Sequence, residues 1–483
     1  MFRDLHSIRC GRVSSRLVAL LVGCSFLLPA DAQAHLSIIR QGAESRGSKE
    51  AGDEHGRALA VGDFNGDGYD DLATGVPKED VGSTVDAGMV VINYGSEFGV
   101  TQAGADFHTA ETMGLTLRTG ALLGSAIVAA DFDHDGYDDL VIGAPGEQVV
   151  FVARAGRVYV LEGGPSGLTF RNSFTQVDAG GVSETDDQFG LALAAGNWNG
   201  DAVPCADLAI GAPGEDNSAG AVYTFHGSTT LFLSADDFFT SADFSQLVIP
   251  GAQIGSSLAA GNFVSTTHED LAIGAARLDI GANDLAGAVY LVRGTSDGLA
   301  TNNYPRYDAG DIDATTETGL FGFSLAGGKL DNGSYDALAI GEPGYDSVDH
   351  PGVGRVHVLS GGSTGLDLAG ALDLRHCDIV GSCGDEDAFG SSVAVGFFET
   401  GGTYEELAIG AHGLGGRLRS AERGRSLRVV RRCERSDRAV RLGRPDAVDL
   451  GRAFRGGRSV RRPGRLRPIR RVEQGRGRGV GPR

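Results

Sequence analysis

The sequence predicts an all-β fold, a β-propeller assembled from repeated sheets of about four short strands. Three observations predict it: glycine supplies 76 of 483 residues without a collagen-like period, one motif recurs six times at near-constant spacing, and short runs alternate apolar and polar side chains. Frequent glycine favours tight turns and close backbone contacts. Alternating runs rich in β-branched and aromatic residues favour strands.

The recurring motif is a pair of short apolar runs around a polar loop, as in LAVGDFNGDGYDDLATGVP from Leu59. The first loop positions of the six repeats are spaced 68, 66, 65, 67 and 68 residues apart, at Asp63, Asp131, Asn197, Asn262, Lys329 and Phe397. A unit of this length cannot bury both of its faces alone, so neighbouring units must stack.

Each repeat has the same internal order of expected strands. A Phe-Gly pair or a close variant opens the first run, and Gly-Ala-Pro or a close variant ends the second, as at Phe189-Gly190 and Gly211-Ala212-Pro213. A glycine-started run such as AGRVYVLEGG from Ala155 supplies a third strand, and the linking stretch leaves room for a fourth. Radial stacking leaves only short sheet edges. A linear β-solenoid is the alternative, but its repeats are usually shorter.

These opening and closing motifs resemble FG-GAP repeats, over residues from about 55 to 412. The resemblance implies the propeller of integrin α subunits, which has seven blades, and is shared with bacterial exported proteins. It also implies calcium in the Asp-rich loops and recognition outside the cell, without identifying a ligand. We therefore assign residues 35–416 to an FG-GAP β-propeller with six blades recognisable in frame.

Two loops have the composition of a calcium site. Oxygen-bearing residues stand at positions 1, 3, 5 and 9, with a tyrosine carbonyl at position 7. The predicted ligands are Asp63, Asn65, Asp67, Tyr69 and Asp71 in the first loop and Asp131, Asp133, Asp135, Tyr137 and Asp139 in the second. Calcium takes six to eight oxygen ligands, and alternate residues of a tight loop can converge on it. A plain Asx turn is the alternative, but so many carboxylates exceed what a turn needs.

The later loops lose this pattern. The third keeps oxygens at Asn197, Asn199, Asp201 and Asp207, but an insertion delays the last by two positions, so it is the weaker candidate. The fourth keeps only Asn262 and Asp270 in place, whereas Lys329 and Phe397 replace the first ligand of the fifth and sixth. We expect these last three loops to be held by ordinary turn packing.

The N-terminus has the pattern of an export signal. Four arginines precede an apolar run from Leu17 to Leu28, and Ala32-Gln33-Ala34 fits a cleavage site, so residues 1–34 are predicted to be a signal peptide. The run is shorter than the ~20 residues that a membrane span needs. A lipoprotein attached through Cys24 is the less favoured alternative.

Cysteine usage fits an exported chain. Cys377 and Cys383 flank a short Gly-containing turn, and a local disulfide between them is predicted, with two reduced thiols as the alternative. Cys205 has no evident partner in the body of the chain.

Charge divides the chain at residue 417. Residues 417–483 hold 23 Arg, no Lys and six acidic residues, a net charge of +17, whereas the whole chain carries −21, so the remainder carries −38. The repeat pattern also stops here, before its third strand. In a shifted reading frame, synonymous codons for Arg431 to Arg438 can spell a GGANGLT turn, and those for Arg461 to Pro468 a GDLDGYDL loop. Our hypothesis is that a frameshift destroyed a seventh blade, leaving an out-of-frame tail and an unclosed ring. A genuine or disordered basic tail is the alternative.

The predicted function is recognition or adhesion by a secreted or cell-surface, calcium-binding module, and not catalysis. Histidines are scattered, no P-loop or dinucleotide fingerprint is present, and the G-x-S-x-G match from Gly361 falls where other repeats have turns. The expected partner is an extracellular protein or glycan, with no transmembrane span. The acidic body argues against nucleic acid. A propeller-type carbohydrate-active or hydrolytic enzyme and a non-functional frameshifted product are the alternatives.

Overall fold

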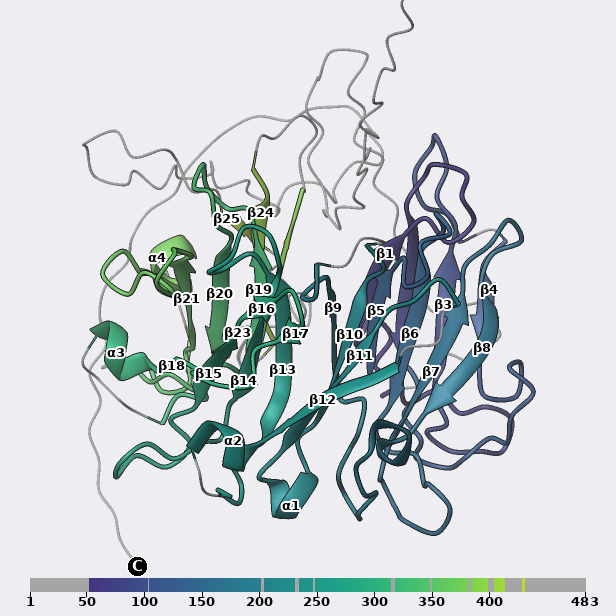
Figure 1. The fold of residues 1–483 in the computed structure, drawn as a ribbon, viewed down its shortest axis with the longest axis horizontal. Helices are drawn as coiled ribbons and strands as arrows, with labels where there is room; N and C mark the ends of the chain where they lie inside the picture. Colours follow the sequence, from purple (N-terminus) through teal and green to yellow (C-terminus); the bar gives the residue numbers. More distant parts are fainter. Residues whose placement is uncertain are drawn as a thin grey trace, which may run out of the picture. The chain divides into compact units, whose positions relative to one another are not determined.

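The computed structural model describes residues 52–412 and 428–430, with gaps at 103, 201–203, 231–233, 246–247, 314–317, 348–349, 381–383 and 398–403. Six antiparallel sheets follow one another along the chain, which confirms the predicted all-β blades (Figure 1). The predicted signal peptide at 1–34 and all of the tail except the strand at 428–430 lie outside the described residues.

The first three blades each contain four strands in meander order. Blade 1 has β1 (Leu59–Gly62), β2 (Asp71–Val76), β3 (Met89–Asn93) and β4 (Asp106–His108). Blade 2 has β5 (Ala126–Ala130), β6 (Asp139–Ala144), β7 (Arg157–Glu162) and β8 (Thr169–Phe174). Blade 3 has β9 (Ala192–Gly196), β10 (Asp207–Ala212), β11 (Ala221–His226) and β12 (Ser234–Thr240).

The next two blades keep this order, and the sixth has three described strands. Blade 4 has β13 (Ile254–Gly261), β14 (Asp270–Ala275), β15 (Ala288–Val292) and β18 (Arg306–Tyr307), with a small hairpin of β16 (Gly294–Thr295) and β17 (Gly298–Leu299). Blade 5 has β19 (Ser324–Gly328), β20 (Ala337–Glu342), β21 (Arg355–Ser360) and β22 (Leu372–Arg375). Blade 6 has β23 (Phe389–Gly396), β24 (Glu406–Ala411) and β25 (Arg428–Val430), so its third strand comes from beyond residue 416.

Short helical turns occupy the connections. A 3₁₀ turn, η1 (Gln176–Ala179), and three α-helices, α2 (Ser241–Ser245), α3 (Ala309–Asp313) and α4 (His376–Val380), follow the fourth strands of blades 2 to 5. The fourth α-helical turn, α1 (Glu215–Ser218), lies in the connection between β10 and β11.

The hydrophobic cores lie between successive blades. One cluster joins Phe64 and Ile92 of blade 1 to Ile142 and Leu161 of blade 2, and four further clusters join blades 2 to 6 pairwise. The second strand of a blade is therefore buried on both faces, as β6, β10, β14 and β20 are throughout. The first strands lie side by side in chain order: β1, β5, β9, β13, β19 and β23.

Glycine is required where one blade meets the next. A Cβ on Gly143 of the Gly-Ala-Pro motif would lie 2.0 Å from the carbonyl oxygen of Gly190, the Phe-Gly glycine of the following blade. The same approach recurs at Gly75, Gly211, Gly274 and Gly341 against Gly124, Gly255, Gly322 and Gly390. Backbone hydrogen bonds accompany it, including Phe189 N–H to Ala155 O at 3.0 Å. The repeat motif thus encodes the blade-to-blade contact.

The outer face of β1 is exposed. Leu59 and Val61 are 59% and 44% exposed, whereas Leu258, which aligns with Leu59, is 8% exposed. Among the described blades none precedes β1, so these two side chains lack the neighbour that covers their counterparts.

Candidate functional site

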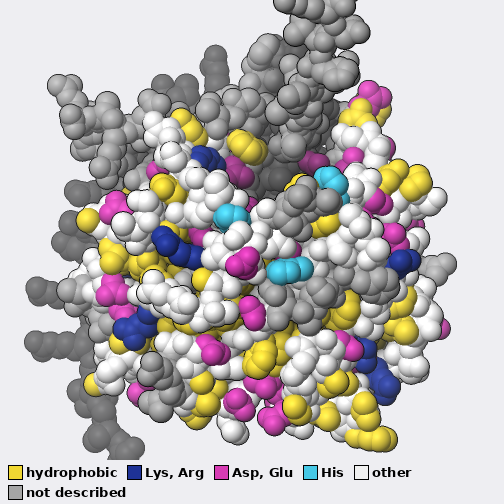
Figure 2. Space-filling model, viewed as in Figure 1, with side chains coloured by type: hydrophobic (Ala, Val, Ile, Leu, Met, Phe, Trp, Pro, Cys, Tyr) yellow, Lys and Arg dark blue, Asp and Glu magenta, His cyan; other side chains and the backbone are white. Residues whose placement is uncertain are grey.

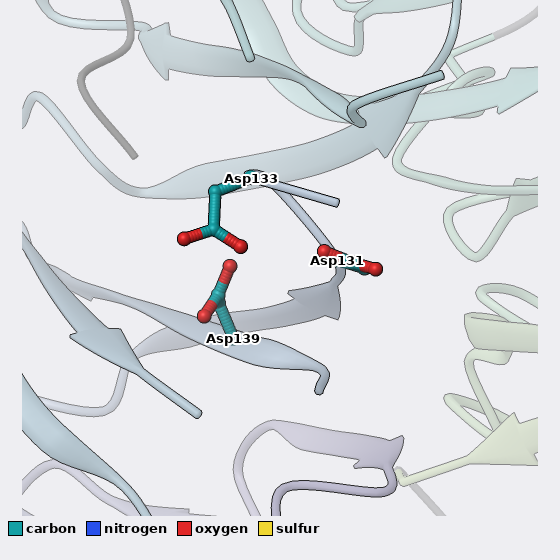
Figure 3. A group of neighbouring side chains, drawn as sticks. All are labelled: Asp131, Asp133 and Asp139. Atoms are coloured by element: carbon teal, nitrogen blue, oxygen red, sulfur yellow. The ribbon is translucent and has the colours of Figure 1, made fainter. Parts of the chain in front are cut away.

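The second Asp-rich loop brings three carboxylates together between β5 and β6. Ligand-type oxygens of Asp131, Asp133 and Asp139 all lie within 4.8 Å of one another. Figure 3 shows the carboxylates of Asp133 and Asp139 facing each other with Asp131 to one side. Asp133 and Asp139 are 8% and 0% exposed. Such a group of hard oxygen donors can hold a divalent cation.

A second group in this loop contains a residue that sequence reasoning missed. Asp133 and Asp135 lie within the same 4.8 Å limit of Glu162, at the end of β7. The aligned residues of the other third strands are Tyr94, His226, Arg293 and Ser360, so only repeat 2 places an acid here. An alignment of the third strands could have identified Glu162 as a candidate ligand. It directly precedes Gly163, whose N–H binds the Asp139 carboxylate.

The two predicted loops differ in how far their carboxylates converge. Among the described residues, the two groups of three acidic oxygens both belong to the second loop, and neither includes Asp63, Asp67 or Asp71. In the first loop Asp63 accepts hydrogen bonds from the backbone N–H groups of Gly66, Asp67 and Gly68 at 2.8–3.1 Å. Asn65 Oδ1 accepts the N–H of Asp67. The described geometry therefore favours the second loop as the more complete site.

The aspartates at position 5 of the two loops, Asp67 and Asp135, each accept a backbone N–H two residues later. Asp67 Oδ1 accepts the N–H of Tyr69, and Asp135 Oδ1 accepts the N–H of Tyr137, each at 2.9 Å. In the second loop Asp131 accepts the N–H groups of Asp135 and Gly136. These are Asx-turn contacts, so the turn and a cation site share the same side chains.

The two loops are in contact with each other. Asp63 N–H donates to Asp138 Oδ2 at 2.8 Å, and Asp138 N–H donates to Asp63 O at 3.1 Å. A Cβ on Gly66 would lie 2.3 Å from the ring of Tyr137, so that ring packs directly on the first loop. A change in the conformation of one loop should therefore alter the conformation of the other.

The aspartate at position 9 also has a structural role. Asp139 Oδ2 accepts the N–H of Phe132 and Oδ1 accepts the N–H of Gly163, at 3.0 and 2.9 Å. Asp71 and Asp207 make the equivalent pair of bonds in blades 1 and 3, and Asp270 accepts the N–H groups of Val264 and Gly294 in blade 4. This residue fastens the loop to the third strand in four blades, including blade 4, whose loop has lost most of its oxygens.

The weaker third loop is built as a turn. Asn199 Nδ2 points at Asp207 Oδ1, 3.4 Å away, so its amide nitrogen faces the carboxylate. Asn197 Oδ1 accepts the N–H of Gly200. Asp201 lies outside the described residues. These contacts bring Asn197, Asn199 and Asp207 to one turn.

The predicted disulfide is described at one end. Cys377 is disulfide-bonded, but Cys383 lies outside the described residues, so their pairing stays a prediction. Cys205 is buried.

Burial and mutual repulsion shift the protonation of the loop carboxylates. Burial, opposed by backbone hydrogen bonds and reinforced by neighbouring aspartates, raises the pKa of Asp139 to about 8 and that of Asp71 to about 7. Burial and the Asp135 carboxylate raise the pKa of Asp133 to about 6. Without a cation, the folded loops therefore hold protons that the unfolded chain releases near pH 4.

A pH dependence follows in the absence of metal. Because the folded-state pKa values are raised, the native state binds more protons than the unfolded state between about pH 4 and 8. Stability in EDTA should therefore fall as pH rises from 6 to 8.5, as measured by thermal melts. Asp139→Asn should flatten this slope, whereas Asp297→Asn, an exposed turn residue, should not. A slope of opposite sign in EDTA would contradict the raised pKa values.

Comparison with known proteins adds the family of the repeats. The family model for the FG-GAP repeat matches residues 55–92 and 123–161. The chain is 33% identical over 233 residues to integrin alpha-PS2 of Drosophila melanogaster, covering 46% of this chain and 15% of that protein. It is 31% identical over 180 residues to phosphatidylinositol-glycan-specific phospholipase D of Bos taurus, covering 36% and 21%. The matches thus span about a fifth or less of these two relatives.

A solved structure of similar shape is the rhamnogalacturonan lyase YesW. Its TM-score is 0.37 at 12% sequence identity, covering 74% of this chain and 56% of the lyase. A score this low assigns neither a fold nor an activity.

One prediction from sequence is wrong. The chain was expected not to be an enzyme because its sequence shows no catalytic motif, yet part of it matches phosphatidylinositol-glycan-specific phospholipase D from four mammals. The chain is thus similar to an enzyme as well as to integrins, and the missing motifs do not exclude catalysis.

The remaining observations agree with recognition by a repeat array. No helix in the described part of the chain is long and apolar enough to cross a membrane. Six consecutive blades, the Phe-Gly and Gly-Ala-Pro contacts between them, and matches to integrin alpha-PS2 and integrin alpha-PS5 point the same way. The chain therefore carries FG-GAP repeats at residues 55–92 and 123–161, and part of it is similar to integrin alpha-PS2.

Proposed function

We propose that this chain is an exported, calcium-binding propeller that recognises a protein or glycan ligand outside the cell. The observation that carries the proposal is the convergence of Asp131, Asp133 and Asp139 in a repeat that the FG-GAP family model matches. The apolar N-terminal run and the acidic body support export and solubility. Whole-protein activities of the relatives are not part of the proposal.

Calcium would act by fixing loop shape. The cation would be held by Asp131, Asp133, Asp135 and Asp139 in the second loop, and by Asp63, Asn65, Asp67 and Asp71 in the first, with carbonyls of Tyr137 and Tyr69 completing each set. Because the loops contact one another through Asp63 and Asp138, filling one would order its neighbour. Rigid loops on a rigid scaffold lose less conformational entropy when they bind a partner.

Ligand binding tests the recognition part of the proposal. The full chain would be immobilised and screened against arrays of extracellular matrix proteins and glycans, in 2 mM CaCl₂ and in EDTA. We expect saturable binding to a ligand that weakens at least tenfold in EDTA and in Asp133→Asn, whereas Asp297→Asn binds as the unaltered protein does. The absence of any saturable binding would contradict the recognition proposal.

A further inference from the structure

A second acidic site lies at the ends of the strands opposite the Asp-rich loops. The connection between β10 and β11, which includes α1, meets the segment before β9 around a pocket of ≈ 610 Å³ lined by Glu184, Asp186 and Asn217 among others. α1 is at the lower edge of Figure 1, and Figure 2 shows acidic side chains along that edge.

Buried oxygens without partners lie beside this pocket. Gln176 and Asp187 are 0% and 1% exposed, yet Gln176 Oε1 and Asp187 Oδ1 accept no hydrogen bond. Gln176 Nε2 donates to Glu215 Oε2 and to Tyr223 Oη, 3.3 Å away, so the amide nitrogen faces Glu215. Burial raises the pKa of Asp187, and a hydrogen bond from the Gln176 side chain partly opposes that rise, although Oδ1 of Asp187 stays without a hydrogen bond. Buried polar atoms left unpaired are costly.

The aligned acid one blade earlier has an internal cation. Glu147 occupies the position of Glu215 one blade earlier, contacts Tyr159 as Glu215 approaches Tyr223, and pairs with Arg157 at 3.1 Å. The residue aligned with Arg157 in blade 3 is Ala221.

A basic partner is also missing at Asp187. Its counterpart before blade 6 is Asp387, which pairs at 2.8 Å with His376, eleven residues earlier. Eleven residues before Asp187 stands the neutral Gln176. Among the described residues, no ion pair joins Glu215 or Asp187 to a basic side chain. Arg154 at the rim pairs with the half-exposed Asp186.

We propose that Glu215, Asp187 and Gln176 form a separate site for a divalent cation that prefers oxygen ligands, such as Ca²⁺. The two carboxylates would bind it, the Gln176 amide would turn over to present its oxygen, and water in the open pocket would fill the remaining positions. The ion would neutralise Glu215 and Asp187, as Arg157 neutralises Glu147 and as His376 pairs with Asp387 in other blades. Burial and neighbouring acids raise the pKa of Glu215 to about 7 and that of Asp187 to about 6, in keeping with uncompensated charge.

Calorimetric titration with CaCl₂ at pH 7.5 tests this site apart from the Asp-rich loops. The full chain carrying Asp67→Asn and Asp135→Asn is expected to retain one site, with a Kd in the ~0.1–1 mM range of extracellular modules. Adding Glu215→Gln or Asp187→Asn should weaken that site at least tenfold. Glu147→Gln, at the aligned position with its own arginine, should leave it unchanged.

Thermal melts in EDTA show whether the variants that lose calcium binding are still folded. Glu215→Gln and Asp187→Asn remove repulsion, so their melting temperatures in EDTA should match or exceed the parent's. Gln176→His, which copies the His376–Asp387 pair, should likewise reduce calcium binding without loss of stability. Absence of residual binding in the loop-deficient parent, or binding that survives the changes at Glu215 and Asp187, would overturn the proposal. Neither result bears on the loops, whose own calcium binding is read from the unaltered protein.

Discussion

Removing calcium with EDTA is expected to lower the melting temperature of this protein by several degrees at pH 7.5. A ligand present at a hundred times its Kd stabilises the native state by about 2.7 kcal/mol per site, so two filled loops would contribute about 5 kcal/mol. That is a large share of the ~5–15 kcal/mol typical of a folded domain.

Substitutions of Asp67 and Asp135, at position 5 of the two loops, distinguish a calcium site from a plain turn. Asp67→Asn with Asp135→Asn keeps an oxygen to accept the N–H groups of Tyr69 and Tyr137, but removes two charges. We expect this variant to lose most of the rise in melting temperature that calcium gives the unaltered protein. Asp297→Asn is the control, because it changes an acid in the β16–β17 turn. If EDTA leaves the melting temperature unchanged, the loops are turns and the calcium proposal fails.

Replacing Gly143 by alanine is expected to be severely destabilising, by about 3 kcal/mol or more, because overpacking against backbone cannot relax through a rotamer change. The new Cβ would lie 2.0 Å from Gly190 O, where an ordinary contact needs more than 3 Å. Blades 2 and 3 would have to separate, exposing Phe189, Tyr223 and other residues of their shared core. Urea unfolding followed by circular dichroism measures the effect.

Gly164→Ala is the matched control in the same blade. Its Cβ would have no neighbour within 4 Å, and its backbone needs no positive φ, so stability should change by less than about 0.5 kcal/mol. A Gly143→Ala protein as stable as this control would show that the blades do not depend on close contact between glycines.

The blades could be predicted from sequence because their signals are local and repeated. Strand alternation, the glycine-started third strand and the loop oxygens at Asp131, Asp133 and Asp139 each lie within about 40 residues of chain. Their recurrence six times at 65 to 68 residues made the blade order readable. The aromatic residue at position 2, including Trp198, is fully buried in blades 1 to 4, as a shared core position requires.

Contacts between blades were decided by the tertiary structure. Glu162 joins the second loop from another strand, and Gln176 reaches Glu215 only because blades 2 and 3 stack. The position-9 aspartates were read as ligands, and their bonds to the third strand appear only once the sheet has formed. The sequence by itself determined the repeats, their strands and the acidic loops. Packing between blades decides which charged side chains have an oppositely charged partner. An ion pair depends on distances of a few ångströms, which sequence spacing does not specify.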